Sequence, residues 1–169
     1  MTDIVVFETP FISLIDRDGY IFLHESRAAG QIVALLPYRD SGSEREYLAR
    51  LEVCPAHSPQ LERCCITGGV NPNSTPPAAA VQEMYEEAGY RITQDALIPL
   101  GTVRPIKSAD TTVHLYAIDV TGMIAVTAPG DGSKFEVGSS TEWVEYAAAV
   151  EQKDPLLIAA LARLALKKQ

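Results

Sequence analysis

The chain has 169 residues, of which 47% are hydrophobic and 21% are charged. This balance is typical of a folded globular protein and excludes a disordered one, and the length suits a single domain over residues 1–169. The formal net charge of −8 opposes binding to a polyanion, so we expect no nucleic-acid partner.

The sequence also indicates in which cellular compartment the protein resides. No apolar run approaches the roughly 18 residues of a membrane-spanning helix, and the N-terminal stretch MTDIVVFETP lacks the basic and apolar regions of a secretion signal. The chain has three cysteines, Cys54, Cys64 and Cys65, and the last two are consecutive. An odd number with two consecutive members is a poor disulfide framework. His57 follows Cys54 closely, but such short pairs are common by chance and do not predict a thiol nucleophile. We expect reduced thiols, a cytoplasmic protein and no membrane partner.

In chain order, the first third of the sequence predicts strands joined by turns. Residues 11–16 and 20–26 flank Arg17-Asp18-Gly19, and Asp-Gly is a strong signal for a tight hairpin. Apolar or alternating runs predict further strands at 31–40, 45–53 and 63–69.

A helix is predicted after the proline- and asparagine-rich stretch that follows. Ser74 or Thr75 can cap its start, and the two prolines after them suit a first helical turn. Apolar residues from Val81 to Ala88 recur at helical spacing, and Gly89 suits a left-handed residue at the end.

The remaining chain mixes strands with a loop and a final helix. Strands are expected at 97–106, 111–120 and 141–147, a Gly/Pro-rich loop at 127–140, and an amphipathic helix at 154–168. Strands, a helix, more strands and a last helix favour an α/β fold of the α+β type over regular βαβ winding.

Three carboxylates lie within five consecutive positions of the predicted central helix. Glu83, Glu86 and Glu87 repel one another at this spacing, by a few tenths of a kcal/mol per pair, and the helix itself contains no lysine or arginine. Grouped hard oxygen ligands on a rigid helix are what Mg²⁺ or Mn²⁺ prefers. A solvated acidic face is the alternative, and the three glutamates alone do not decide between the two.

The residues around the cluster decide in favour of a metal site. From Gly68 to Tyr90 the chain resembles the signature of the Nudix hydrolases, in which a glycine precedes a helix carrying Glu-apolar-x-Glu-Glu-x-Gly. The helical half of the signature matches at Glu83, Met84, Glu86, Glu87, Gly89 and Tyr90. Two positions differ: Ser74 stands where the family has glutamate, and Gln82 where it has an arginine thought to orient the catalytic carboxylate.

This resemblance implies a Nudix-like α/β/α sandwich with a mixed sheet, and an enzyme that cleaves the pyrophosphate of a nucleoside diphosphate linked to another moiety. It implies Mg²⁺ or Mn²⁺ as cofactor, a small nucleotide as substrate, and a possible homodimer. The altered Ser74 and Gln82 leave open a catalytically weak or inactive nucleotide-binding module.

The resemblance also assigns candidate site residues. The metal ligands and catalytic carboxylates would be Glu83, Glu86 and Glu87, with the backbone carbonyl of Gly68, or of Thr67 if the loop is one residue shorter. The family often adds a carboxylate from a later loop; Glu136 is the first candidate, followed by Asp131 and Glu142.

Substrate recognition is predicted from fewer signals. Arg39, Arg50, Arg104 and Lys107 are candidate cations for the phosphates, and Pro105 is placed similarly to a proline of the ADP-ribose pyrophosphatase branch. ADP-ribose or a nucleoside diphosphate sugar is therefore favoured as substrate, with nucleoside triphosphates second.

Overall fold

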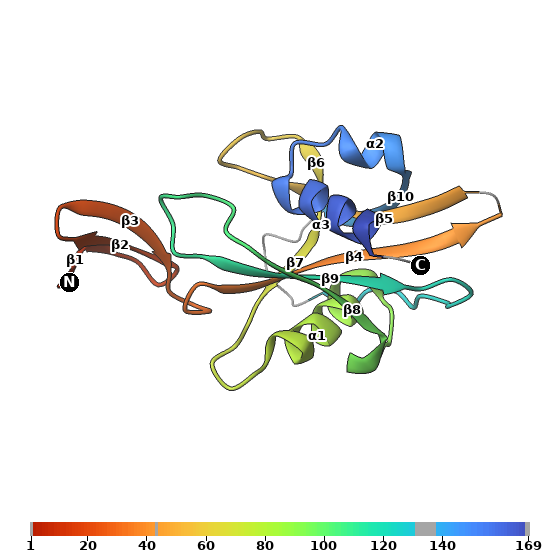
Figure 1. The fold of residues 1–169 in the computed structure, drawn as a ribbon, viewed down its shortest axis with the longest axis horizontal. Coiled ribbons are helices and arrows are strands. Elements are labelled where there is room, and N and C mark those ends of the chain that lie inside the picture. The colour runs from red at the N-terminus through yellow and green to blue at the C-terminus, as the bar shows by residue number, and fades with distance from the viewer. Residues whose placement is uncertain (1, 43, 131–137, 168–169) are drawn as a thin grey trace.

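The computed structural model describes residues 2–42, 44–130 and 138–167, which form two sheets and flanking helices (Figure 1). The strands are β1 (Asp3–Glu8), β2 (Ile12–Arg17), β3 (Tyr20–Glu25), β4 (Gln31–Ser41), β5 (Glu44–Val53), β6 (Leu61–Cys64), β7 (Ile66–Gly69), β8 (Leu97–Val103), β9 (Thr112–Asp119) and β10 (Ser140–Glu145). The helices are α1 (Pro76–Ala88), the short 3-10 helix η1 (Gln94–Ala96), α2 (Tyr146–Val150) and α3 (Pro155–Leu166).

The N-terminal sheet has the order β1-β2-β3 and projects from one end of the molecule (Figure 1). Its hairpin turn is the predicted one: Asp18 and Gly19 both have positive φ, as a tight two-residue turn requires. β1, which the sequence did not predict, pairs with β2 and is exposed along its length. The sheet contacts the loop between β8 and β9: the Leu23 backbone bonds to Ser108 and Asp110 at 2.8 and 3.1 Å, and the His24 side chain bonds to Asp110 at 2.7 Å.

The larger sheet has the order β10-β5-β4-β9-β8, with β6 added to β5 and β7 added to β4. β4 and β9 are parallel and the other pairs are antiparallel, so the sheet is mixed as predicted. The prediction of one strand at 63–69 is wrong, because the chain changes partner at Cys65. The Cys65 N–H donates to Asp154 at 2.5 Å instead of joining a ladder, and a fork opens between β6 and β7.

Helices cover both faces of this sheet, which confirms the predicted α/β/α sandwich (Figure 1). Side chains of β4 alternate between two cores. Val33 and Leu35 pack with Met84 of α1, whereas Leu36 packs with Leu157 of α3 on the other face. The two faces are named below after α1 and α3.

Both ends of α1 follow from local sequence. Thr75 is the N-cap, and its hydroxyl accepts a hydrogen bond from the Ala78 N–H. Gly89 ends the helix at φ 73°, where its N–H and that of Tyr90 donate to the Tyr85 and Met84 carbonyls.

The C-terminal region differs from expectation in one place. The strand predicted at 141–147 ends at Glu145, and the alanine-rich residues after it form α2. Helix α3 begins where predicted, because Asp154 accepts hydrogen bonds from the Leu156 and Leu157 N–H groups at 3.0 and 3.3 Å. No helix in the described ranges combines the length and apolar character needed to cross a membrane.

Candidate active site

The side chain of Glu83 lies directly over Gly68. Gly68 is in β7, paired with Val33 of β4, and α1 crosses this point. A β-carbon on Gly68 would overlap the carboxyl carbon and Oε1 of Glu83. Only glycine leaves room for that carboxyl group, so the first glycine of the signature positions its first helical carboxylate.

Glu87 is held by a buried arginine. Arg50 projects from the middle of β5 and is only 5% exposed. Its guanidinium donates to the Glu87 carbonyl at 3.0 Å and to the Ser139 hydroxyl at 2.7 Å, and its Nε lies 3.8 Å from Glu87 Oε2. A cation at the C-terminal end of a helix is also favoured by the helix dipole. Arg50 therefore joins α1 to β5 and to the segment that leads into β10.

Glu86 is placed by contacts to both its side chain and its backbone. Gln82, one turn earlier, donates to Glu86 Oε1 at 3.0 Å. The Gly130 N–H donates to the Glu86 carbonyl at 2.8 Å, and the Val126 N–H donates to the Gly89 carbonyl at 3.0 Å. These bonds tie residues 126–130 to the end of α1, so the Gly/Pro-rich loop starts beside the carboxylates.

A pocket of about 450 Å³ opens at this point. It is lined by Arg50, Glu86 and Glu87, and by residues 127–130 and 139–141, so both ends of the loop border the carboxylates. The predicted loop carboxylate Glu136, and Asp131, lie outside the described residues. Glu142, the remaining candidate, pairs with Arg63 at 2.8 Å.

Arg39 lies on the same face of the sheet as α1. Arg39 lies four residues after Leu35 in β4. Because alternate residues of a strand face the same side, Arg39 faces the side on which Leu35 packs against α1. Its Nε donates to Glu46 at 2.8 Å, and its guanidinium stacks on the Trp143 ring at 4.2 Å from the centroid. Burial raises the pKa of the Tyr90 hydroxyl, and the positive charge of Arg39 partly opposes that rise. Arg39 therefore lies near the end of the signature.

The structure does not bring Arg104 and Pro105 to the carboxylates. Both are exposed in the loop between β8 and β9. Arg104 lines a separate pocket of about 440 Å³ with Arg17 and Lys107, where this loop meets the N-terminal sheet. That pocket shares no lining residue with the pocket at Glu86 and Glu87.

The two residues that depart from the signature both make hydrogen bonds close to their own positions on the chain. Gln82 makes the bond to Glu86 described above. The Ser74 hydroxyl faces the Thr75 carbonyl at 3.4 Å, at the start of the helix. Neither of these two residues carries a charge; among the described residues, Arg50 is the buried cation next to the carboxylates.

The residues at this site fit a hard divalent cation. Glu83 sits in a space that a β-carbon would fill, and Glu86 and Glu87 are fixed on the same rigid helix by hydrogen bonds to its carbonyls. All the candidate ligand atoms, including the Gly68 carbonyl, are oxygens. Oxygen ligands suit Mg²⁺ and Mn²⁺ better than they suit Zn²⁺.

The structure gives Arg50 contacts that the sequence did not predict. Its guanidinium bonds to the Glu87 carbonyl and the Ser139 hydroxyl, while its predicted phosphate contact stays a prediction. The available signal was a lone arginine in the run YLARLEV of a strand expected to be half-buried, because a buried charge needs partners within the protein.

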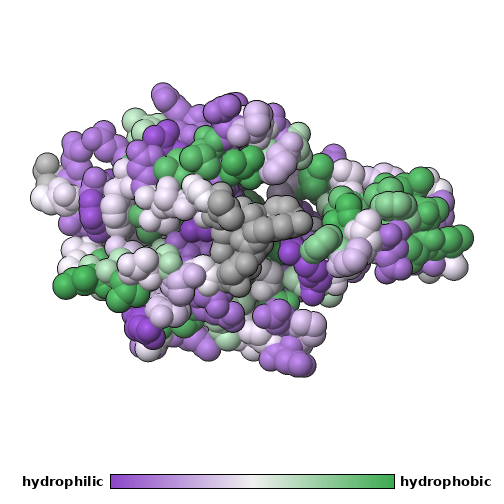
Figure 2. Space-filling model, turned by 180° about the vertical axis from the view of Figure 1, so that it is seen from behind, coloured by the Kyte–Doolittle hydropathy of each residue, from purple (hydrophilic) through white to green (hydrophobic). Residues whose placement is uncertain are grey.

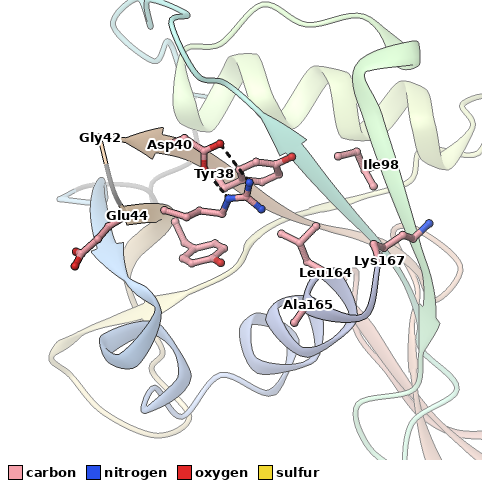
Figure 3. Close-up of a pocket in the computed structure, with 10 residues that line it drawn as sticks. Tyr38, Asp40, Gly42, Glu44, Ile98, Leu164, Ala165 and Lys167 are labelled. Atoms are coloured by element: carbon pink, nitrogen blue, oxygen red, sulfur yellow. Dashed lines mark hydrogen bonds and ion pairs between the residues drawn. The ribbon is translucent and has the colours of Figure 1, made fainter. Parts of the chain in front are cut away.

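A larger pocket, of about 970 Å³, lies on the α3 face (Figure 3). Its arginine, Arg45, is bound to Asp40 at 2.8 and 3.3 Å and stacks on Tyr38 at 4.2 Å. Ile98 and Leu164 line the side formed by β8 and α3 (Figure 3). None of the signature residues lines it, so we place the candidate active site on the α1 face.

No protein-family model and no curated protein sequence matches the chain. Solved structures do match in fold. A MutT/nudix family protein from Enterococcus faecalis is 18% identical with a TM-score of 0.53, over 68% of this chain and 43% of that one. A C. elegans Ap4A hydrolase is 18% identical in a binary complex, with a TM-score of 0.58 over 80% and 95% of the two chains. Another structure titled C. elegans Ap4A hydrolase is 20% identical, with a TM-score of 0.55 over 80% and 96%.

These likenesses establish the fold. The chain spans less than half of the Enterococcus protein but nearly the whole of the C. elegans one. The mixed sheet between α1 and α3 is the Nudix-like fold that the sequence predicted.

Proposed function

We propose that the protein is a divalent-metal-dependent hydrolase of the Nudix kind. It cleaves the pyrophosphate of a nucleoside diphosphate linked to another moiety, with ADP-ribose or a nucleoside diphosphate sugar favoured and nucleoside triphosphates second. The observation that carries this proposal is the close contact between the Glu83 carboxyl group and Gly68. If the glutamates formed only a solvated acidic face, no glycine would be needed beneath Glu83.

In this proposal the α1 carboxylates hold Mg²⁺ or Mn²⁺. Glu83, Glu86 and Glu87 are the ligands, together with the Gly68 carbonyl. When bound, the cation offsets charge on the phosphoryl oxygens and lowers the pKa of a coordinated water. The protein's own contribution is positional: Arg50 holds Glu87, and Gln82 holds Glu86.

Arg39 is the proposed contact for the substrate's phosphates. It is 40% exposed, lies on the α1 face, and is held in place by Glu46 and Trp143. A cation fixed in this way loses little freedom when it binds an anion, which favours recognition. Arg104 and Pro105 remain predictions for a more distant part of the substrate.

The alternative is a nucleotide-binding module with little or no catalysis. Ser74 and Gln82 favour it, since they replace a charged pair of the family with neutral groups. The intact carboxylates favour the enzyme, because a binder of anions gains nothing from three glutamates without a cation.

We also propose that residues 1–169 act as one cytoplasmic unit that forms a homodimer. The N-terminal sheet supports the dimer, because it exposes a group of large apolar side chains on the projecting lobe (Figure 2): Ile4, Val5, Val6, Phe7, Phe11, Tyr20 and Ile21. Apolar patches of this kind on a projecting element mark interaction surfaces. The three free thiols are consistent with a reducing compartment.

One assay tests the function. The purified protein is given ADP-ribose, nucleoside diphosphate sugars, nucleoside triphosphates and Ap4A, with Mg²⁺, with Mn²⁺ or with EDTA, and released phosphate and AMP are measured. We expect hydrolysis only with metal, and none for Glu87→Gln. Glu151→Gln, an exposed acid at the end of α2, is the control and should be fully active. Turnover that persists in EDTA or in Glu87→Gln would contradict the metal-dependent mechanism, and nucleotide binding without turnover would support the binding module.

A further inference from the structure

We propose that Glu52, Cys54 and Cys64 form a second metal site, for a thiophilic cation of the Zn²⁺ type, at the fork between β6 and β7. One possible ligand atom from each residue lies within 4.8 Å of the others. Two thiols and one carboxylate are a ligand set that suits Zn²⁺ and is poorly suited to Mg²⁺.

The spacing of the two sulfurs matches tetrahedral coordination. Zn–S bonds are about 2.3 Å long, which places two sulfurs at a tetrahedral centre about 3.8 Å apart. Cys54 Sγ and Cys64 Sγ are 3.6 Å apart. The observed spacing of the two sulfurs is therefore close to the one that a shared Zn²⁺ ion requires, and a carboxylate oxygen of Glu52 lies within 4.8 Å of both.

The β5–β6 hairpin supplies the ligands from fixed backbone positions. Glu52 of β5 faces Glu62 of β6, and Cys64 is two residues further along β6, so Glu52 and Cys64 are diagonal neighbours on one face. Cys54 follows β5 and starts a turn, in which its carbonyl accepts hydrogen bonds from the His57 and Ser58 N–H groups at 2.8 and 2.9 Å.

His57 is the candidate for the fourth position. The turn keeps it close to Cys54, and it lines the same cavity of about 520 Å³ as the three ligands. Neutral imidazole nitrogen is a common zinc ligand, so His57 has suitable chemistry for this position. A solvent molecule is the other group that can fill this position.

The charges around the cavity favour a cation. Its lining includes Glu52, Glu62 and Asp154 beside the three cysteines Cys54, Cys64 and Cys65. Among the described residues that line it, Lys153 is the only lysine or arginine, and this side chain is 87% exposed and pairs with Glu62 at 3.6 Å. An exposed pair of this kind contributes little to stability, so the carboxylate and thiol ligands, and not Lys153, set the chemistry of the cavity.

Cys65 is excluded from the ligand set. It is fully buried, and its Sγ contacts the Leu35 carbonyl at 3.1 Å, in the core on the α3 face. Cys65 also borders the cavity, but its thiol donates to Leu35 and is not part of the cluster of Glu52, Cys54 and Cys64, so it provides a matched control. The site is also separate from the α1 carboxylates, since the two pockets share no lining residue.

Cobalt titration tests the proposal. Reduced, chelator-treated protein is titrated with Co²⁺ in excess Mg²⁺, and thiolate-to-cobalt charge-transfer absorption is recorded, followed by displacement with Zn²⁺. We expect one equivalent of Co²⁺ to saturate the band, Zn²⁺ to remove it, and Cys54→Ser, Cys64→Ala and Glu52→Gln each to weaken binding by roughly tenfold or more. Cys65→Ala should keep the band.

Circular dichroism on each variant separates loss of metal binding from loss of fold. Cys64 is buried, so Cys54→Ser, at a half-exposed position, is the decisive variant if Cys64→Ala does not fold. Wild-type protein that shows no charge-transfer band, or a band that is unchanged in folded Cys54→Ser, would overturn the proposal.

Discussion

The carboxyl group of Glu83 occupies the space that a side chain on Gly68 would need. This contact joins β7 to α1, and so links the glycine at the start of the signature to the helical half of the signature. It explains why a glycine, and no other residue, stands at the point where the strand passes under the helix.

Gly68→Ala should therefore displace the Glu83 carboxylate without unfolding the protein. Gly68 does not have positive φ, so alanine is compatible with the backbone, and the side chain that must move is flexible. Since a displacement of about 1 Å in an active site can reduce the rate by about a hundredfold, we expect a loss of kcat of that order. Steady-state kinetics with thermal unfolding measure the two effects.

Gly69→Ala is the matched control. Its β-carbon would meet only the Ala28 methyl, at 3.1 Å, and no carboxylate. We expect a modest decrease in stability and nearly unchanged turnover. Equal losses of turnover in the two variants would show that Gly68 acts through the strand and not through Glu83.

Arg50 should affect catalysis through Glu87. Arg50→Lys keeps the charge but cannot maintain bonds to both the Glu87 carbonyl and Ser139. A lost hydrogen bond to a charged group costs about 1.5–3 kcal/mol, so kcat should decrease by roughly tenfold or more while KM changes little. A variant in which KM rises and kcat is retained would indicate a phosphate contact, as the sequence alone suggested.

Arg39 and Arg45 form a natural pair for testing which face binds substrate. Each arginine pairs with an acid and stacks on an aromatic ring, Arg39 on the α1 face and Arg45 on the α3 face. Arg39→Ala should raise KM by roughly tenfold through loss of a charged contact, and Arg45→Ala should leave KM unchanged. The reverse pattern, measured with the best substrate of the panel, would place binding in the pocket of Figure 3.

His114 should make stability depend on pH. Burial lowers its pKa from 6.5, and as a neutral ring its Nε2–H donates to Gln31 Oε1 at 3.0 Å. The folded state then binds a proton less readily than the unfolded state, so the contribution is fully present above pH 6.5 and is lost as the pH falls through the folded pKa.

Urea unfolding at several pH values, compared with His114→Gln, isolates this contribution. The wild type should lose more stability below pH 6.5 than the variant does. Parallel curves for the two proteins would assign the acid sensitivity to other groups.

The fold was largely predictable because its local signals agree with its packing. The Asp18-Gly19 turn, the Thr75 cap and the Gly89 terminus each satisfy a backbone requirement that can be seen in sequence. The change of partner at Cys65 could not be predicted, since it depends on Asp154, a residue far away in the chain that accepts the Cys65 N–H.

The relative positions of the candidate site residues were predictable where the residues lie on one element, and not where they come from several elements. Glu83, Glu86 and Glu87 share one helix, so their spacing predicted that they lie close together. Arg50 and Arg104 look alike in sequence, but strand pairing puts one beside Glu87 and the other at the N-terminal sheet.

Mn²⁺ binding, followed by electron paramagnetic resonance, tests the central claim most directly, because it reports on the carboxylates whether or not a substrate is known. Wild-type protein should bind Mn²⁺ and release it to Mg²⁺, and Glu87→Gln should weaken binding by about tenfold or more. Equal Mn²⁺ affinity in Glu87→Gln and wild type would contradict a metal site on α1.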